Sequence, residues 1–242
     1  MRRALLTLAL LHALLLVMVY PIHAEGNTSN TSVRKIGIDD ILFAPSSFVS
    51  AIEDDLTLSG YMRTRTKEGE APKNFSDTVD ESERFLAIRL GRFGLTAGWL
   101  SDVDESILEP SILSIDYKYP FPYVVGNDMI FAGAIKYSTR KPPGSDMRSA
   151  LLNSGVFSIT GIASKPFFSR FTIYGGVSAN YIYLDARSDK LTDLWKPVPF
   201  VGIMINFLLH YNASIVSELN RGRLDDSEDA IWTWHLGVSI GL

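Results

Sequence analysis

The final stretch of the chain, AIWTWHLGVSIGL from Ala230 to Leu242, constrains the fold more than any other. Counted back from the end, every second residue is apolar, and the residues between are small or polar. The apolar set is Trp232, Trp234, Leu236, Val238, Ile240 and Leu242. Successive side chains of a β-strand point to opposite faces, so this alternation predicts a strand with one apolar and one polar face.

The same alternation runs upstream to Leu56 and predicts ten strands. They are residues 56–65, 85–90, 94–100, 112–119, 129–138, 155–164, 171–184, 198–208, 213–220 and 231–242. Every second connection is short or apolar, as in GRF, PFPYVVGND, KPFFSR and LHYN, whereas the others are longer, polar and charged. The longer connections, expected to be external loops, are 66–84, 101–111, 139–154, 185–197 and 221–230. Short turns at one end and long loops at the other are typical of membrane barrels, so the sequence predicts an all-β, transmembrane, antiparallel up-and-down β-barrel over residues 56–242.

The strand count has alternatives. The segments 85–90 and 94–100 are shorter than the about 9 to 11 residues that a tilted strand needs to cross a bilayer. Residues 85–100 could form a single strand, and the segment from Ile36 to Phe43 could then supply the missing one. Counts of eight or twelve strands are also open.

Aromatic residues gather at both ends of the predicted strands. Trp99, Trp195, Trp232 and Trp234 all fall on the side of the long loops. The short turns carry Phe93, Tyr119, Phe121, Phe167, Phe168, Phe171, Phe207 and Tyr211. Two aromatic girdles that flank an apolar band are expected of a protein in a bilayer. A soluble β-sandwich or lipocalin-like barrel is the alternative, because a sheet with one buried face also alternates.

The closing strand resembles that of Gram-negative outer-membrane β-barrels, which carry apolar residues at every second position from the end. That family usually ends on an aromatic residue, whereas this chain ends on Leu242. The resemblance covers residues 56–242 and is architectural, to small bacterial outer-membrane β-barrel proteins in general. It implies location in the bacterial outer membrane, contact with its lipid and lipopolysaccharide, and recognition of the C-terminal strand by the barrel assembly machinery.

Residues 1–24 have the order of a secretory signal peptide. Arg2 and Arg3 precede an apolar run that extends to Tyr20, and the small residue Ala24 follows. A transmembrane anchor is the alternative, but the run is short for a span of about 20 residues. Residues 25–55 are expected to be a periplasmic segment outside the barrel, either poorly ordered or a strap.

Composition excludes several classes of function. Removing residues 1–24 takes two of the 23 basic residues and none of the 27 acidic ones, which leaves a net charge of −6 and argues against nucleic acid as a partner. The chain has no cysteine, which excludes disulfides and thiolate metal sites. No metal and no cofactor are expected.

The charged residues of the predicted strands share the phase opposite to the apolar residues. They are Arg63, Arg65, Arg89, Asp116, Lys118, Lys136, Glu218 and His235. A charged residue that faces lipid costs about 2 to 4 kcal/mol at the midplane, so this shared phase indicates a charged lumen. The charges either pair across a narrow lumen and fill it, or line a thin passage that prefers anions.

Glu218, His235 and Arg63 give a more specific prediction than the other charged residues. If residues 213–220 and 231–242 form a hairpin, Glu218 and His235 face each other inside the barrel near its outer mouth, and closure brings Arg63 close. A carboxylate that orients a histidine is a general-base arrangement, but it is also an ordinary buried salt bridge, and no serine, metal ligand or second acid is placed to complete a site. The sequence therefore predicts a structural or narrow-pore protein with a mostly plugged lumen. The alternative is an outer-membrane hydrolase of lipid or peptide with its site at the external mouth, and whether the protein is an enzyme stays open.

Overall fold

The computed structural model describes residues 56–67, 83–99, 110–125, 128–140, 154–168, 170–184, 195–208, 213–223 and 230–241. The predicted signal peptide and periplasmic segment, residues 1–55, lie outside the described residues. The described part of the chain contains no helix that is long and apolar enough to cross a membrane.

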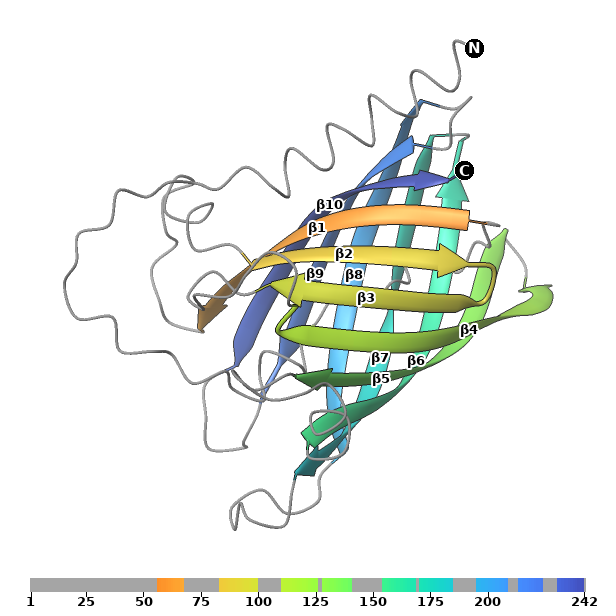
Figure 1. Cartoon of the computed structure of the whole chain (residues 1–242). Coiled ribbons are helices and arrows are strands. Elements are labelled where there is room, and N and C mark those ends of the chain that lie inside the picture. The colour runs from red at the N-terminus through yellow and green to blue at the C-terminus, as the bar shows by residue number, and fades with distance from the viewer. Residues whose placement is uncertain are drawn as a thin grey trace, which may run out of the picture.

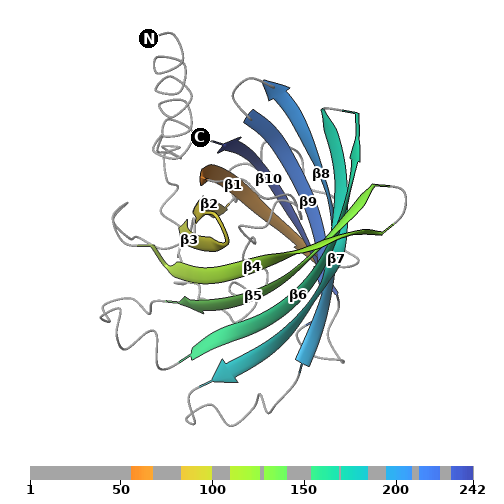
Figure 2. The same cartoon turned by 90° about the vertical axis from the view of Figure 1, so that its right-hand side faces the viewer.

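Ten strands close into one barrel (Figure 1). They are β1 (Leu56–Lys67), β2 (Glu83–Leu90), β3 (Phe93–Trp99), β4 (Ile112–Val125), β5 (Met129–Arg140), β6 (Ser154–Phe167), β7 (Phe171–Leu184), β8 (Trp195–Leu208), β9 (Ala213–Gly222) and β10 (Ile231–Gly241). Each strand pairs antiparallel with its neighbours in sequence, and β1 pairs with β10 to close the ring. In Figure 2, β4 to β8 curve around one wall of the barrel. The prediction of an all-β, antiparallel up-and-down barrel with ten strands is confirmed.

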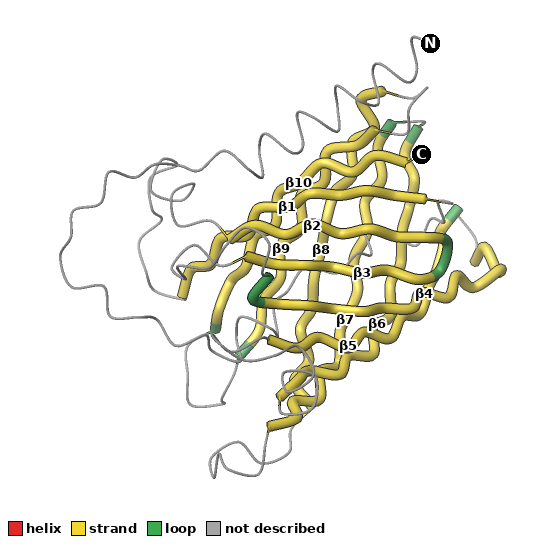
Figure 3. The backbone as a smooth tube through the Cα atoms, in the orientation of Figure 1, coloured by secondary structure: helices red, strands yellow, loops and turns green. Residues whose placement is uncertain are grey.

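The two ends of the barrel differ in their connections. At the end called here the turn end, the strands are joined by residues 91–92, 126–128, 168–170 and 209–212. At the opposite end, the loop end, the connections are residues 68–82, 100–111, 141–153, 185–194 and 223–230. The predicted alternation of short and long connections is confirmed, and Figure 3 shows the described turns at the ends of the strands.

Residues 83–99 form the two strands β2 and β3, so the alternative of a single strand over 85–100 is wrong. Gly91 and Arg92 make a two-residue turn between Leu90 and Phe93, which are paired in the ladder. Gly91 has a φ of 55°, a left-handed conformation that glycine adopts without a steric penalty. The barrel closes without the segment from Ile36 to Phe43, which lies outside the described residues.

Strand β8 begins at Trp195, three residues before its predicted start, although Pro197 and Pro199 follow. Proline is confined to places where its missing N–H is not needed by a neighbouring strand. β8 pairs with β7 from Trp195 onward, but its pairing with β9 begins only at Phe200. The two prolines therefore lie where β8 has a neighbour on one side only.

The barrel has an apolar outer face and a polar inner face. Large apolar side chains such as Leu95, Ile115, Ile159, Val201 and Ile215 are exposed on the outside. Buried positions are mostly polar or charged, with hydroxyl pairs such as Ser59 with Ser239 and Ser114 with Ser138 bonded across strands on the inside. A soluble barrel would bury its apolar face, so the alternative of a soluble sandwich or lipocalin-like barrel is wrong.

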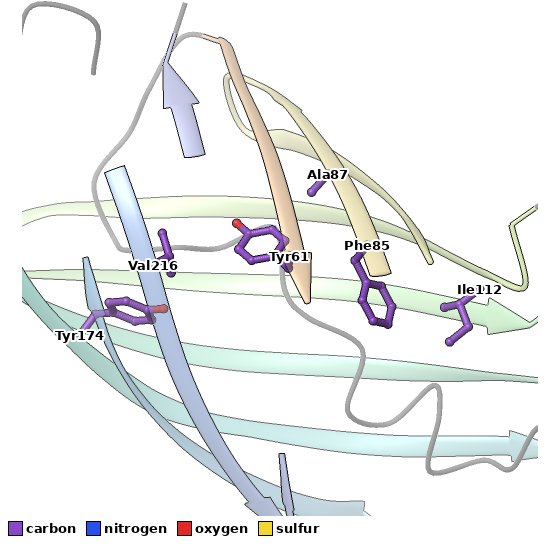
Figure 4. Packing of buried hydrophobic residues seen from close by; sticks show 6 residues of the cluster. All are labelled: Tyr61, Phe85, Ala87, Ile112, Tyr174 and Val216. Carbon is purple, nitrogen blue, oxygen red and sulfur yellow. The ribbon is translucent and has the colours of Figure 1, made fainter. Parts of the chain in front are cut away.

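A cluster of aromatic and aliphatic side chains fills part of the interior. It comprises Tyr61, Phe85, Ala87, Ile112, Tyr174 and Val216, with Phe200 and Met204 packed against it. Figure 4 shows Tyr61 and Tyr174 on either side of Val216, and Phe85 nearer to Ile112. The larger rings lie over glycines directly across the ladder: Tyr61 pairs with Gly237, Phe85 with Gly98 and Tyr174 with Gly202.

These glycines make room for the rings, which gives a direct test of interior packing. A Cβ at Gly202 would lie 2.2 Å from Cζ of Tyr174, so Gly202→Ala must displace that ring. Overpacking of this kind costs about 1 to 3 kcal/mol in the free energy of unfolding. The control is Gly161→Ala, because a Cβ at this outward-facing glycine has no atom within 4 Å. Urea unfolding in lipid vesicles should separate the two, and equal stabilities would contradict the packing described.

Candidate functional site: the charged interior

Four charged or titratable side chains lie in one row across neighbouring strands. In the ladder, Glu218 of β9 pairs with His235 of β10, His235 pairs with Arg63 of β1, and Arg63 pairs with Glu83 of β2. All four are buried. The closure of β1 against β10 completes this row, because it joins residues from the two ends of the barrel sequence.

Glu218 and His235 lie close enough for an ion pair. His235 Nδ1 is 3.5 Å from Glu218 Oε1, and the Tyr174 hydroxyl donates to Glu218 Oε2 at 3.1 Å. Asn220 lies against the same pair, 3.5 Å from His235 Nδ1. The side chains have little access to solvent, with His235 only 1% and Glu218 only 7% exposed.

Glu83 is the acidic partner of the two arginines on β1. Its carboxylate accepts hydrogen bonds from Nε of Arg63 and from Nη2 of Arg65. The Arg63 guanidinium also lies 4.8 Å from the centroid of the Phe85 ring, a cation–π contact. Arg63 is fully buried, so its charge depends on these neighbours rather than on water.

A second ion pair lies closer to the turn end. Arg89 of β2 donates to the Asp116 carboxylate of β4, and its other terminal nitrogen donates to the Arg92 carbonyl at 3.0 Å. Asp116 is also paired in the ladder with Lys136 of β5. Lys118, Lys136 and Lys196 are buried and each interacts with other groups of the protein. The ion pairs of the interior therefore join side chains of nearby strands.

All eight charged residues predicted for the lumen lie on the inward face, and seven of them are buried, with Arg65 partly buried. Sequence reasoning missed two more, Glu83 and Lys196. Both lie in the first two residues of a strand whose predicted start was too late, so they were assigned to external loops. Among the residues whose side chains are described, the interior holds six Lys or Arg residues and three acids. One face of β2 carries Glu83, Phe85, Ala87 and Arg89, and this alternation could have identified Glu83.

Three basic residues that lie outside the predicted strands face outward in the structure. Arg84, Lys165 and Arg221 occupy the outward phase of β2, β6 and β9. All three are near strand ends, where a long basic side chain can reach the polar edge of a membrane. Arg221 lies 5.3 Å from the centroid of the Trp232 ring and Lys165 lies 5.2 Å from that of Phe167. Charged side chains of the described strands therefore face inward in the middle of the strands, whereas basic side chains near the strand ends can face outward.

The four tryptophans lie at the loop end. Trp99 is the last residue of β3, Trp195 is the first of β8, and Trp232 and Trp234 are near the start of β10. Trp195 packs against Tyr181 with ring centroids 5.7 Å apart, and Trp234 Nε1 donates to Ser217 at 2.8 Å. Among the described residues, no three His, Asp or Glu side chains gather as a metal site would require.

A closed antiparallel barrel with an apolar outer face and a charged, buried inner face is by class a transmembrane β-barrel. No protein-family model and no curated protein matches the chain.

Among solved structures, the chain is similar to structures of Ail, the attachment invasion locus protein of Yersinia pestis. A crystal structure with the heparin analogue sucrose octasulfate has 13% identity and a TM-score of 0.30, over 78% of this chain and 97% of that chain. A structure in phospholipid bilayer nanodiscs has 16% identity and a TM-score of 0.34, over 76% and 97%. A further crystal structure has 11% identity and a TM-score of 0.25, over 78% and 97%.

Proposed function

We propose that the protein is an outer-membrane β-barrel whose lumen is closed by its own side chains and whose role in the envelope is structural. The apolar outer face extends over ten strands, and exposing so large an apolar surface to water would be unfavourable. This face therefore supports the membrane location. An exported barrel that crosses a bacterial outer membrane needs such a face together with turns at one end and loops at the other. The tryptophans at the loop end and the phenylalanines at the turn end suit the two membrane interfaces.

The single observation that carries the closed lumen is the buried linkage of its charges. Arg63 and Arg65 bond to Glu83, Arg89 bonds to Asp116, and Glu218 lies between His235 and Tyr174. A conducting passage needs charges that water and ions can reach. The aromatic cluster around Phe85 adds bulk at the same depth, which favours a filled lumen over an anion passage.

The hydrolase alternative receives no support from this arrangement. A general base must reach the proton that it removes in a bound substrate. His235 and Glu218 are buried within the row of ion pairs, and Tyr174 and Asn220 occupy the positions beside them. The pair is therefore better explained as part of the plug.

Conductance across a planar bilayer tests the closed lumen. We expect the refolded wild type, with insertion checked by heat-dependent gel mobility, to give no steady single-channel current. Phe85→Ala with Tyr174→Ala should create a leak, because it removes two of the largest buried side chains of the lumen. The control is Phe93→Ala, which shortens an outward-facing aromatic residue.

Robust currents from the wild type would contradict the closed lumen. A preference of those currents for anions would instead favour the narrow-pore function, given the excess of basic residues inside. Recognition of the C-terminal strand by the barrel assembly machinery stays a prediction, as does contact with lipopolysaccharide at the loop end.

A further inference from the structure

The tip of the β6–β7 hairpin differs from the other turns of the barrel. From residue 154 to residue 184 the chain has only two charged side chains, Lys165 and Arg170. Both are basic, and both are at the tip, on either side of Phe167 and Phe168. The tip is therefore a concentrated positive charge on an otherwise uncharged hairpin.

Phe168 has a left-handed backbone conformation, with a φ of 57°, that glycine and aspartate adopt more readily than phenylalanine. Among the described residues, three have a positive φ: Gly91, Asp128 and Phe168, and all three lie in turns at the turn end. Glycine and aspartate adopt this conformation readily, whereas a bulky residue there is strained. The Phe168 side chain is 94% exposed, so no packing inside the protein offsets this strain. An exposed ring on a strained backbone indicates a contact outside the chain.

The tip has the architecture of a membrane-interface anchor. Lys165 faces outward and lies 5.2 Å from the centroid of the Phe167 ring, and Phe167 packs against Phe171 with centroids 6.2 Å apart. The backbone N–H of Asn206 donates a hydrogen bond to the backbone carbonyl of Arg170 at 2.8 Å, which connects the turn to β8. The rings suit the boundary between lipid tails and headgroups, and the two cations suit the phosphates just beyond it.

We propose that this tip, formed by Lys165, Phe167, Phe168, Arg170 and Phe171, is a binding site for anionic phospholipids of the leaflet next to the turn end. The positive charges of Lys165 and Arg170 attract the negatively charged headgroup of the lipid, and Phe168 inserts beside the acyl chains. The inference rests on the proposed membrane location and adds to it a lipid class and a site. The turn end is basic in general. Asp128 is the one acidic side chain in its described turns, which also contain Arg92 and Arg170, and Lys165 lies nearby at the end of β6.

The test uses the full chain folded in neutral detergent micelles and titrated with short-chain phosphatidylglycerol or phosphatidylcholine. Lipid retention is measured by native mass spectrometry. We expect the wild type to retain phosphatidylglycerol in preference. Lys165→Gln with Arg170→Gln should weaken that binding by about fivefold for each charge removed. The control, Arg223→Gln, removes an exposed arginine at the loop end and should leave the preference unchanged.

Phe168→Gly separates the ring from the backbone. Because glycine relieves the positive φ, this variant should unfold at a temperature equal to or above that of the wild type without lipid, yet retain less phosphatidylglycerol. A variant that retains the lipid as well as the wild type would overturn the role of the ring.

Two further outcomes bear on the site itself. Equal retention of the two lipids by the wild type, or full competition by inorganic phosphate, would overturn the site as one for anionic lipid while leaving the barrel in the membrane. Failure of the wild type to show the heat-dependent gel mobility of an inserted barrel would instead overturn the proposed function on which the site rests.

Discussion

Glu83→Gln is expected to lower the free energy of unfolding by about 3 to 5 kcal/mol, because breaking a buried ion pair leaves an uncompensated charge. Glu83 accepts hydrogen bonds from both Arg63 and Arg65, and Arg63 is fully buried. Glutamine keeps the volume of the side chain but removes the negative charge that both arginines share. Urea titration of the protein folded in lipid vesicles measures the change.

The control is Asp128→Asn, which also removes one carboxylate. Asp128 is exposed in a turn and has a φ of 59°, a conformation that asparagine tolerates equally well, so this substitution should be nearly neutral. Adding Arg65→Gln to Glu83→Gln should recover part of the loss, because it removes one of the two positive charges that Glu83 neutralises. Equal small effects of Glu83→Gln and Asp128→Asn would show that the interior ion pairs do not stabilise the fold.

Ile159→Lys should destabilise the inserted barrel by about 2 to 4 kcal/mol, the cost of a lysine facing lipid near the midplane. Ile159 is near the middle of β6, faces outward and is 48% exposed. In water, a lysine at such an exposed position would be nearly neutral. The same urea titration in vesicles therefore tests directly whether lipid covers this face.

The matched control places a lysine on the same strand but closer to the membrane interface. Ala163 faces outward on the same strand, two residues from Lys165, so a lysine there can extend to the interface. Ala163→Lys should cost only about 0 to 1 kcal/mol. If Ile159→Lys were as mild as Ala163→Lys, the outer face would not lie in a bilayer, and the proposed membrane location would be wrong.

The class of fold could be predicted from the sequence because its signal is local. A strand shows its two faces within a few residues, so the alternation from Trp232 to Leu242 identifies the closing strand without any knowledge of its partners. The inward direction of Arg89, Asp116 and Lys136 follows from the same local phase. The alternation of short and long connections was also visible, since it depends only on where each strand ends.

The partners of the charges were decided by the tertiary structure. Glu83 follows a polar run and Lys196 precedes two prolines, so local composition assigned both to loops. They belong to strands because neighbouring strands supply the hydrogen bonds: β1 pairs with Glu83 and β7 pairs with Lys196. Which acid neutralises Arg63 depends on the register of β1 with β2, and its contact with His235 depends on closure against β10. Local alternation determines the face on which a side chain lies, but only pairing between distant segments determines what it meets there.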